Sequence, residues 1–376
     1  MSKTVAMNPA FNYLIIIEPL GLLYGSAGGF LSPENLVGLS REKFPPSAAT
    51  VSGLFAASLG NEAIQKLRLA GPFWGKIDQV FSQVDDPKLH QNFYVPTPFT
   101  YVLDEDTVDD KLVYNDANNS WMKTKQDRQL KKNEEKTWIA IANWKTPIKV
   151  EKSPWEFCPH LHPKLEPNER RVKRINNQEN DPGSLFLENA VQMEPDTCLV
   201  YLSNLELESN MAENQASKWY RFGGEGHIVD VSCIPLNEDR QTLLQEKIQN
   251  QFALITPGVW GSNRLSYREP IELNQKDAQQ AQQLDSENNS KKVWEIKSIY
   301  TKRPQPFRYR LGNSNDPEQT NIKRLSRGRY AVPAGTVYVL NQSLNQSWQE
   351  WPESWFPKEG PSLKRWGCGL ALPLLT

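Results

Sequence analysis

The order of strand-type and helical segments constrains this chain more than any single motif does. The segment Tyr13–Glu18 is a short β-branched run typical of a strand, and Ser47 is an N-cap candidate for the helix that follows. The apolar face of that helix carries Val51, Leu54, Phe55 and Leu59. Cys198–Asn204 then has the composition of a further strand. The first half of the chain is therefore expected to place a strand, a helix and later strands in that order.

The same order recurs in the second half. His227–Ile234 has strand character, and Asn237 is a candidate N-cap for a helix in which Leu244, Ile248 and Phe252 recur every fourth residue. Later apolar runs predict strands at 252–258, 293–300 and 335–340. A strand, a helix and more strands, found twice, predict an α+β protein of two ferredoxin-like (RRM-like) domains with helices on one face of each sheet.

Long polar insertions interrupt this pattern. Residues 104–179 mix charge runs with few periodic segments, which favours an inserted arm, and the glutamine-rich stretch 274–292 favours a loop. We therefore expect an N-terminal domain over 1–220 that carries the arm and a C-terminal domain over 221–376.

Composition narrows the class of protein. A chain of 376 residues with 38% apolar residues can bury a substantial core. The apolar stretch 13–23 is interrupted by Glu18 and Pro19 and is too short to span a membrane, so a cytoplasmic protein without a membrane partner is expected. The four cysteines form no C-x-x-C pair, which fits a reducing compartment. No disulfide, metal or other cofactor is therefore expected.

Charge is balanced overall but not locally. Residues 297–329 contain nine cations and only two anions, and aromatic residues are interleaved with them: Tyr300, Phe307, Tyr309 and Tyr330. Cations hold phosphates while aromatic rings stack on unpaired bases, so this mixture favours single-stranded nucleic acid. A solvated basic face is the plainer alternative.

The C-terminal segment KRWGCGLALP adds a second candidate site. Gly367 and Gly369 permit positive φ and close approach to main-chain N–H groups, and Lys364 and Arg365 stand directly before them. The segment therefore indicates a loop that meets an anion. A turn at a strand end, with a solvated lysine, remains the alternative because a single G-x-G is a weak signal.

Three further patterns in the sequence each allow more than one reading. His227 is a candidate general base for a nuclease, although no second histidine is placed near it by the sequence. Cys158, His160 and His162 would share one side of a strand, but a fourth zinc ligand is not evident. The tryptophans of NQSWQEWPESWFP predict core packing or a protein-docking ridge.

Eight blocks in order carry a resemblance to a known family. From about Tyr13 to Pro373 the chain resembles the RAMP superfamily of CRISPR-associated proteins, and within it the family of the third subunit of the Cmr module in type III-B effector complexes. One departure is the segment Leu23–Gly25, where relatives often carry Phe-Arg. The matching blocks are IIIEPLGLLYG, FPPSAATVSGLFAA, LAGPFW, FYVPTPF, RFGGEGH, LITPGVW, YAVPAGTVYVL and RWGCGLALP.

The resemblance implies a non-catalytic subunit that grips the 5′ repeat-derived tag of crRNA and meets target RNA. Its implied protein partners are a large polymerase/cyclase-like subunit and the other RAMP subunits of a Cmr complex acting in antiviral defence. An endoribonuclease that processes precursor crRNA and a protein-only scaffold are the alternatives. The resemblance and the basic clusters together suggest these RNA contacts: Arg221, Gly223, Gly224, Arg308, Arg310, Arg324, Arg327, Arg329, Lys364, Arg365, Trp366, Gly367 and Gly369. A tight turn is the alternative for the glycine pair.

Overall fold

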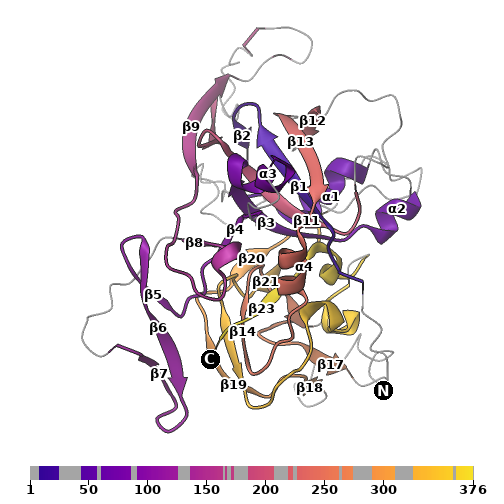
Figure 1. Cartoon of the computed structure of the whole chain (residues 1–376). Coiled ribbons are helices and arrows are strands. Elements are labelled where there is room, and N and C mark those ends of the chain that lie inside the picture. Colours follow the sequence, from indigo (N-terminus) through magenta and orange to yellow (C-terminus); the bar gives the residue numbers. More distant parts are fainter. Residues whose placement is uncertain are drawn as a thin grey trace, which may run out of the picture.

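The computed structural model is a sheet-rich α+β protein with few helices (Figure 1). In the part that it describes, no helix is long and apolar enough to cross a membrane. The described residues are 8–24, 44–56, 61–85, 91–125, 136–163, 166, 171–172, 185–206, 219–222, 227–261, 265–273, 290–309, 325–358 and 361–375.

A seven-stranded antiparallel sheet organises the first half. The β-branched run of β1 is buried, with Leu14 to Ile17 fully covered, because layers pack on both faces of the sheet. The expected strands at 13–18, 198–204 and 227–234 are confirmed. In spatial order the strands are β12 (Trp219–Phe222), β13 (His227–Pro235), β1 (Tyr13–Pro19), β11 (Thr197–Ser203), β3 (Leu69–Lys76), β4 (Tyr94–Pro96) and β8 (Trp138–Ala140).

Helices cover both faces of this sheet. Alternate residues of β1 enter two different cores: Ile15 and Ile17 pack with α1 (Ala48–Ala56), whereas Leu14 and Ile16 share a core with Val80 of α3 (Ile77–Asp85). The helix expected after Ser47 is confirmed; Leu59 lies outside the described residues. The same half contains α2 (Asn61–Lys66) and a second sheet, β2 (Leu23–Tyr24), β10 (Leu185–Met193) and β9 (Trp155–Pro163).

A four-stranded sheet and an aromatic core form the second half. Phe252, Trp294 and Tyr338 pack against one another, with ring centroids 5.0 to 5.4 Å apart. Trp351 joins them and is 1% exposed, so the core-packing reading of the C-terminal tryptophans is confirmed. The sheet order is β19 (Ile296–Tyr300), β22 (Val337–Leu340), β14 (Gln251–Leu254) and β23 (Ala371–Pro373), and the 3-10 helices are η5 (Trp348–Glu350), η6 (Glu353–Trp355) and η7 (Leu363–Trp366).

The helix after Asn237 is shorter than its apolar period suggests. The Asn237 side chain caps α4 (Glu238–Leu244) by accepting a hydrogen bond from the Asp239 N–H, as expected. The helix ends at Leu244, and Ile248 enters the core from the connection to β14. The apolar residues at every fourth position therefore reflect burial of the segment. The expectation that the helix continues to Phe252 was wrong.

The expected arm at 104–179 is only partly separate. Three antiparallel strands form a small sheet at the left of Figure 1, and it contacts the body where the Trp121 Nε1–H donates to the Ser298 hydroxyl at 2.9 Å. The strands are β5 (Tyr101–Asp104), β6 (Thr107–Asn115) and β7 (Ser120–Lys123). Beyond them the chain returns through β8, the buried Trp138 and the 3-10 helix η2 (Ile141–Asn143). Residues 138–143 therefore belong to the body of the protein, because the side chains of Trp138, Ile139 and Ile141 are buried in its core.

The first sheet also continues beyond the boundary predicted at residue 220. β12 contains that boundary, and β13 pairs with β1 along seven residue pairs. The division into two ferredoxin-like domains stays a prediction. The remaining strands form small antiparallel pairs: β15 (Trp260–Gly261) with β16 (Ser266–Tyr267), β17 (Ile271–Leu273) with β18 (Ser290–Lys292), and β20 (Gln305–Phe307) with β21 (Arg329–Ala331).

Candidate nucleic-acid interface

The C-terminal glycine turn packs against the first sheet. Ser362 caps η7 by accepting a hydrogen bond from the Lys364 N–H, and Gly367 ends it with a left-handed φ of 64°. A Cβ built on Gly367 would lie 2.2 Å from the Cβ of Ala70 in β3. The positive φ predicted from G-x-G is present, but the chain that comes close here is the protein's own β3.

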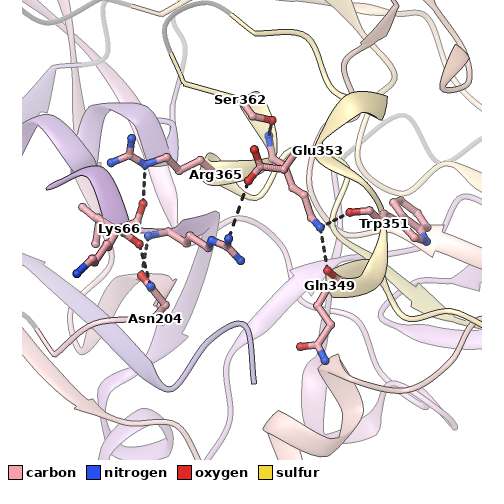
Figure 2. A network of polar contacts seen from close by, with 10 residues as sticks. Lys66, Asn204, Gln349, Trp351, Glu353, Ser362 and Arg365 are labelled. Atoms are coloured by element: carbon pink, nitrogen blue, oxygen red, sulfur yellow. Dashed lines mark hydrogen bonds and ion pairs between the residues drawn. The ribbon is translucent and has the colours of Figure 1, made fainter. Parts of the chain in front are cut away.

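Lys364 is buried, so its expected exposure was wrong. Its side chain is 8% exposed, and its Nζ donates hydrogen bonds to the carbonyl oxygens of Gln349, at 2.8 Å, and Trp351 (Figure 2). Burial lowers the pKa of Lys364 to about 8, with Arg68 as a weaker cause in the same direction. The ammonium group binds one carbonyl within η5 and one directly after it, which is a structural role.

Arg365 is also used internally. Its Nε–H donates to the carbonyl of Leu67 at 2.7 Å, and burial lowers the pKa of its guanidinium. Arg68, one residue further, places its Nη2 3.9 Å from the Glu353 carboxylate, and its N–H donates to Asn204 at 2.6 Å. Figure 2 shows these contacts joining the α2–β3 connection to the C-terminal segment. This network ties the two halves of the molecule together.

The rest of the turn packs in the same region. Trp366 is half-buried and meets Tyr309 edge to face, with ring centroids 4.8 Å apart. Gly369 has a φ of 65°, and a Cβ there would lie 3.0 Å from the Trp260 ring. The KRWGCG turn therefore lies next to the basic segment before β21, as a shared site would require. The contact between them is made by packed aromatic rings.

The predicted arginines divide by exposure. Arg327 is exposed, as is Arg221 on the edge strand β12. Arg308 is half-buried and donates through Nε to the Ser326 carbonyl at 2.8 Å, whereas Arg329 is 5% exposed. The predicted contacts that lie outside the described residues are Gly223, Gly224, Arg310 and Arg324.

An exposed basic and aromatic surface remains beside β20 and β21. We define the β20–β21 basic surface as Lys302, Arg303, Arg327 and Tyr330, all of which are exposed. Tyr330 is 58% exposed and stands opposite Pro306 across the two strands. The combination of cations and an accessible ring can hold phosphates and stack on a base. The sequence predicted a basic and aromatic cluster in this region. Because Lys302, Arg303 and Tyr330 are exposed and Arg329 is buried, those three residues are stronger candidates for RNA contacts than Arg329 is.

The catalytic and metal alternatives receive no added support. His227 begins β13 and is half-buried. Among the described residues no group of three histidine, cysteine or acidic side chains is placed to hold a metal ion. Cys158 lies on β9, but the side chains of His160 and His162 are outside what the structure describes.

Comparison with solved structures finds partial likeness in shape. The type III-B Cmr-beta complex bound to cognate target RNA contains a chain with 11% identity and a TM-score of 0.44, with 87% of this chain and 86% of that chain covered. A chain of the Csm1-Csm4 cassette in complex with pppApA gives 9% identity and a TM-score of 0.33, covering 88% and 87%. A chain of the type III-A Csm3-Csm4 subcomplex gives 13% identity and a TM-score of 0.32, covering 89% and 94%.

The family assignment rests on the sequence. Comparison with curated proteins finds no match. Residues 111–376 match the family of the CRISPR-associated protein (Cas_Cmr3), a span that includes the β20–β21 basic surface and the C-terminal turn. Because this span is well over half of the chain, the protein belongs to the Cas_Cmr3 family of CRISPR-associated proteins.

Proposed function

We propose that the protein is a non-catalytic, crRNA-binding subunit of a type III-B CRISPR effector complex. In this role it grips the 5′ repeat-derived tag of crRNA and docks the large polymerase-like subunit. Membership of the Cas_Cmr3 family is the observation that carries the proposal. The β20–β21 basic surface supports the RNA-binding part, because it offers exposed cations at both ends of a strand pair that carries the exposed ring of Tyr330.

The structure changes which residues we assign to the RNA. Lys302, Arg303 and Arg327 would contact phosphates, and Tyr330 would stack on an unpaired base. Lys364 is removed from the set because its ammonium group is buried on carbonyl oxygens. Arg310 and Arg324 stay in the set as predictions from sequence.

Fluorescence anisotropy with labelled single-stranded RNA that begins with the tag tests this assignment. The double variant Arg303→Glu, Arg327→Glu should bind at least tenfold more weakly. Its log–log salt slope should be shallower by about 1.4, since each single-strand phosphate contact contributes about 0.7. The matched control Lys66→Glu, Lys247→Glu reverses two exposed lysines on α2 and after α4 and should bind as the unaltered protein does.

The same measurements separate the alternatives. A protein-only scaffold would show equal affinity and equal salt slope for both double variants. An endoribonuclease would cut the RNA, and the cleavage would disappear in His227→Ala. Our proposal expects the RNA to stay intact during the assay, with a scrambled RNA of equal length binding more weakly than the tag RNA.

A further inference from the structure

The edge of the seven-stranded sheet carries a face whose six residues are fixed by strand register. Across β12, β13 and β1 one row contains Trp219, Asp230 and Glu18, since each is paired with the next. Directly paired residues point to the same side of a sheet. The neighbouring row places Arg221 opposite Ile228, with the Leu20 N–H donating to the Ile228 carbonyl at 3.2 Å. We call these six residues the β12 edge face.

Among the described residues, the cover on this side of the sheet stops before the β12 edge face. Further along the sheet α3 lies over β3, where a Cβ on Gly75 would meet the Val80 side chain at 2.2 Å. On the edge face, by contrast, Leu20 is 52% exposed, Ile228 42% and Trp219 63%. Three large apolar side chains thus stand together in solvent, an arrangement typical of an interaction surface.

Two carboxylates lie side by side within this apolar setting. Burial, and then the neighbouring Asp230, raises the pKa of Glu18. The Oδ1 atom of Asp230 is buried and accepts no hydrogen bond from the described residues. Arg221 is exposed nearby, yet within the described part of the chain no ion pair joins it to either acid. Like charges paired directly across strands destabilise a sheet, so this pair costs stability in the isolated chain.

The charge of the face decides the chemistry of its occupant. A nucleic acid would bring phosphates toward two unneutralised carboxylates and be repelled. A guanidinium group suits the site, because its planar fork can pair with carboxylates while its face stacks on the ring of Trp219. A lysine could supply the charge but not the stacking plane.

We propose that the β12 edge face docks an arginine-bearing segment of a neighbouring protein subunit, with apolar side chains of that segment covering Leu20 and Ile228. The assignment rests on the proposed function, because the neighbour would belong to the same effector complex. It adds a protein-binding surface that is separate from the β20–β21 basic surface.

Photo-crosslinking in the effector complex, isolated through an affinity tag on this chain, tests the occupant. A photoreactive phenylalanine at position 228 should crosslink to a peptide of another protein, with an arginine within a few residues of the attachment point. The same group at position 148, where the natural Ile148 is 68% exposed on a different segment, is the control for unspecific capture and should not yield that peptide.

Charge variants test the mechanism. Glu18→Lys combined with Asp230→Lys should reduce recovery of the crosslinked subunit at least tenfold, whereas Glu272→Lys on the distant β17 should leave it unchanged (Figure 1). Glu18→Gln should raise the urea midpoint of the isolated chain, since it removes a repulsion, and at the same time lower recovery of the subunit severalfold. A merely structural role would move both readouts in the same direction.

The outcomes distinguish this proposal from the one on which it rests. Tag-RNA affinity should be unchanged in the edge-face variants. An intact complex in which position 228 crosslinks to RNA, to a second copy of this chain or to nothing overturns the docking proposal and leaves the proposed function in place. Failure to isolate any complex overturns both.

Discussion

Replacing Gly367 by alanine tests whether the C-terminal turn holds the two halves of the molecule together. Gly367 ends η7 with a φ of 64° and packs against strand β3. A Cβ at this position would be 2.2 Å from the Cβ and 2.5 Å from the Cα of Ala70. The obstacle is therefore backbone, which cannot rotate away as a flexible side chain could. To admit the methyl group, η7 must move off the sheet.

Two costs add in this variant. A non-glycine residue held in the left-handed region costs about 1–2 kcal/mol, and forcing extra volume into a packed site costs about 1–3 kcal/mol. The expected loss is about 2–5 kcal/mol, which is large against the total stability of about 5–15 kcal/mol that is typical of folded proteins. The Lys364 and Arg365 hydrogen bonds would be disturbed by the same movement.

Urea denaturation followed by tryptophan fluorescence measures the effect. Gly53→Ala is the matched control, because a Cβ there meets nothing within 4 Å and the site lies inside α1. It should stabilise by about 0.5–1 kcal/mol. Gly369→Ala should fall between the two, since its φ is 65° but its nearest neighbour is a Trp260 ring atom at 3.0 Å. Equal midpoints for Gly367→Ala and Gly53→Ala would refute the packing argument.

Three other predictions concern stability. Raising the pH from 7 to 10 should stabilise the protein relative to Lys364→Met by about 2–3 kcal/mol, because the folded pKa of about 8 lies below the unfolded value of 10.5 and the unfolded chain therefore binds more protons over this range. Urea midpoints at both pH values check the sign, and no difference would contradict the burial of the charge. Trp351→Ala should cost about 3–5 kcal/mol, whereas Trp219→Ala in the isolated chain should stay within about 0.5 kcal/mol by thermal unfolding; similar losses would argue against the aromatic core. Asn237→Ala should cost about 1 kcal/mol by removing the hydrogen bond from the Asp239 N–H, and Asn237→Ser should recover most of that loss.

Local chemistry made several elements readable from the sequence. A β-branched run such as that of β1 favours a strand. An asparagine before a run of periodic apolar residues favours a helix start, because its side chain accepts a backbone hydrogen bond whatever the helix packs against. Core packing was one of the two readings of the clustered tryptophans, and the aromatic core around Trp294 confirms it. Ordered blocks along the chain likewise sufficed to indicate the family.

The helix after Asn237 and the expected arm show where local reasoning stopped. Apolar residues that recur every fourth position indicate side chains buried on one face of a segment. Ile248 is buried in this way although it lies outside any helix. Trp138 followed a polar stretch and gave no sign that it would complete the first sheet. The end of the helix and the place of Trp138 both depend on residues distant in the chain, and the periodicity of a local segment carries no information about those residues.

By itself the sequence determined the strand and helix types, the left-handed glycines of the C-terminal turn and the family. Only the tertiary structure decided what those glycines approach and which charges reach solvent. Lys364 and Arg327 are both cationic residues in the sequence, yet the Lys364 ammonium is buried on carbonyl oxygens and Arg327 is exposed. The physical reason is that burial is set by the surface packed against a residue, and for Lys364 that surface comes from Trp348, Gln349 and Trp351.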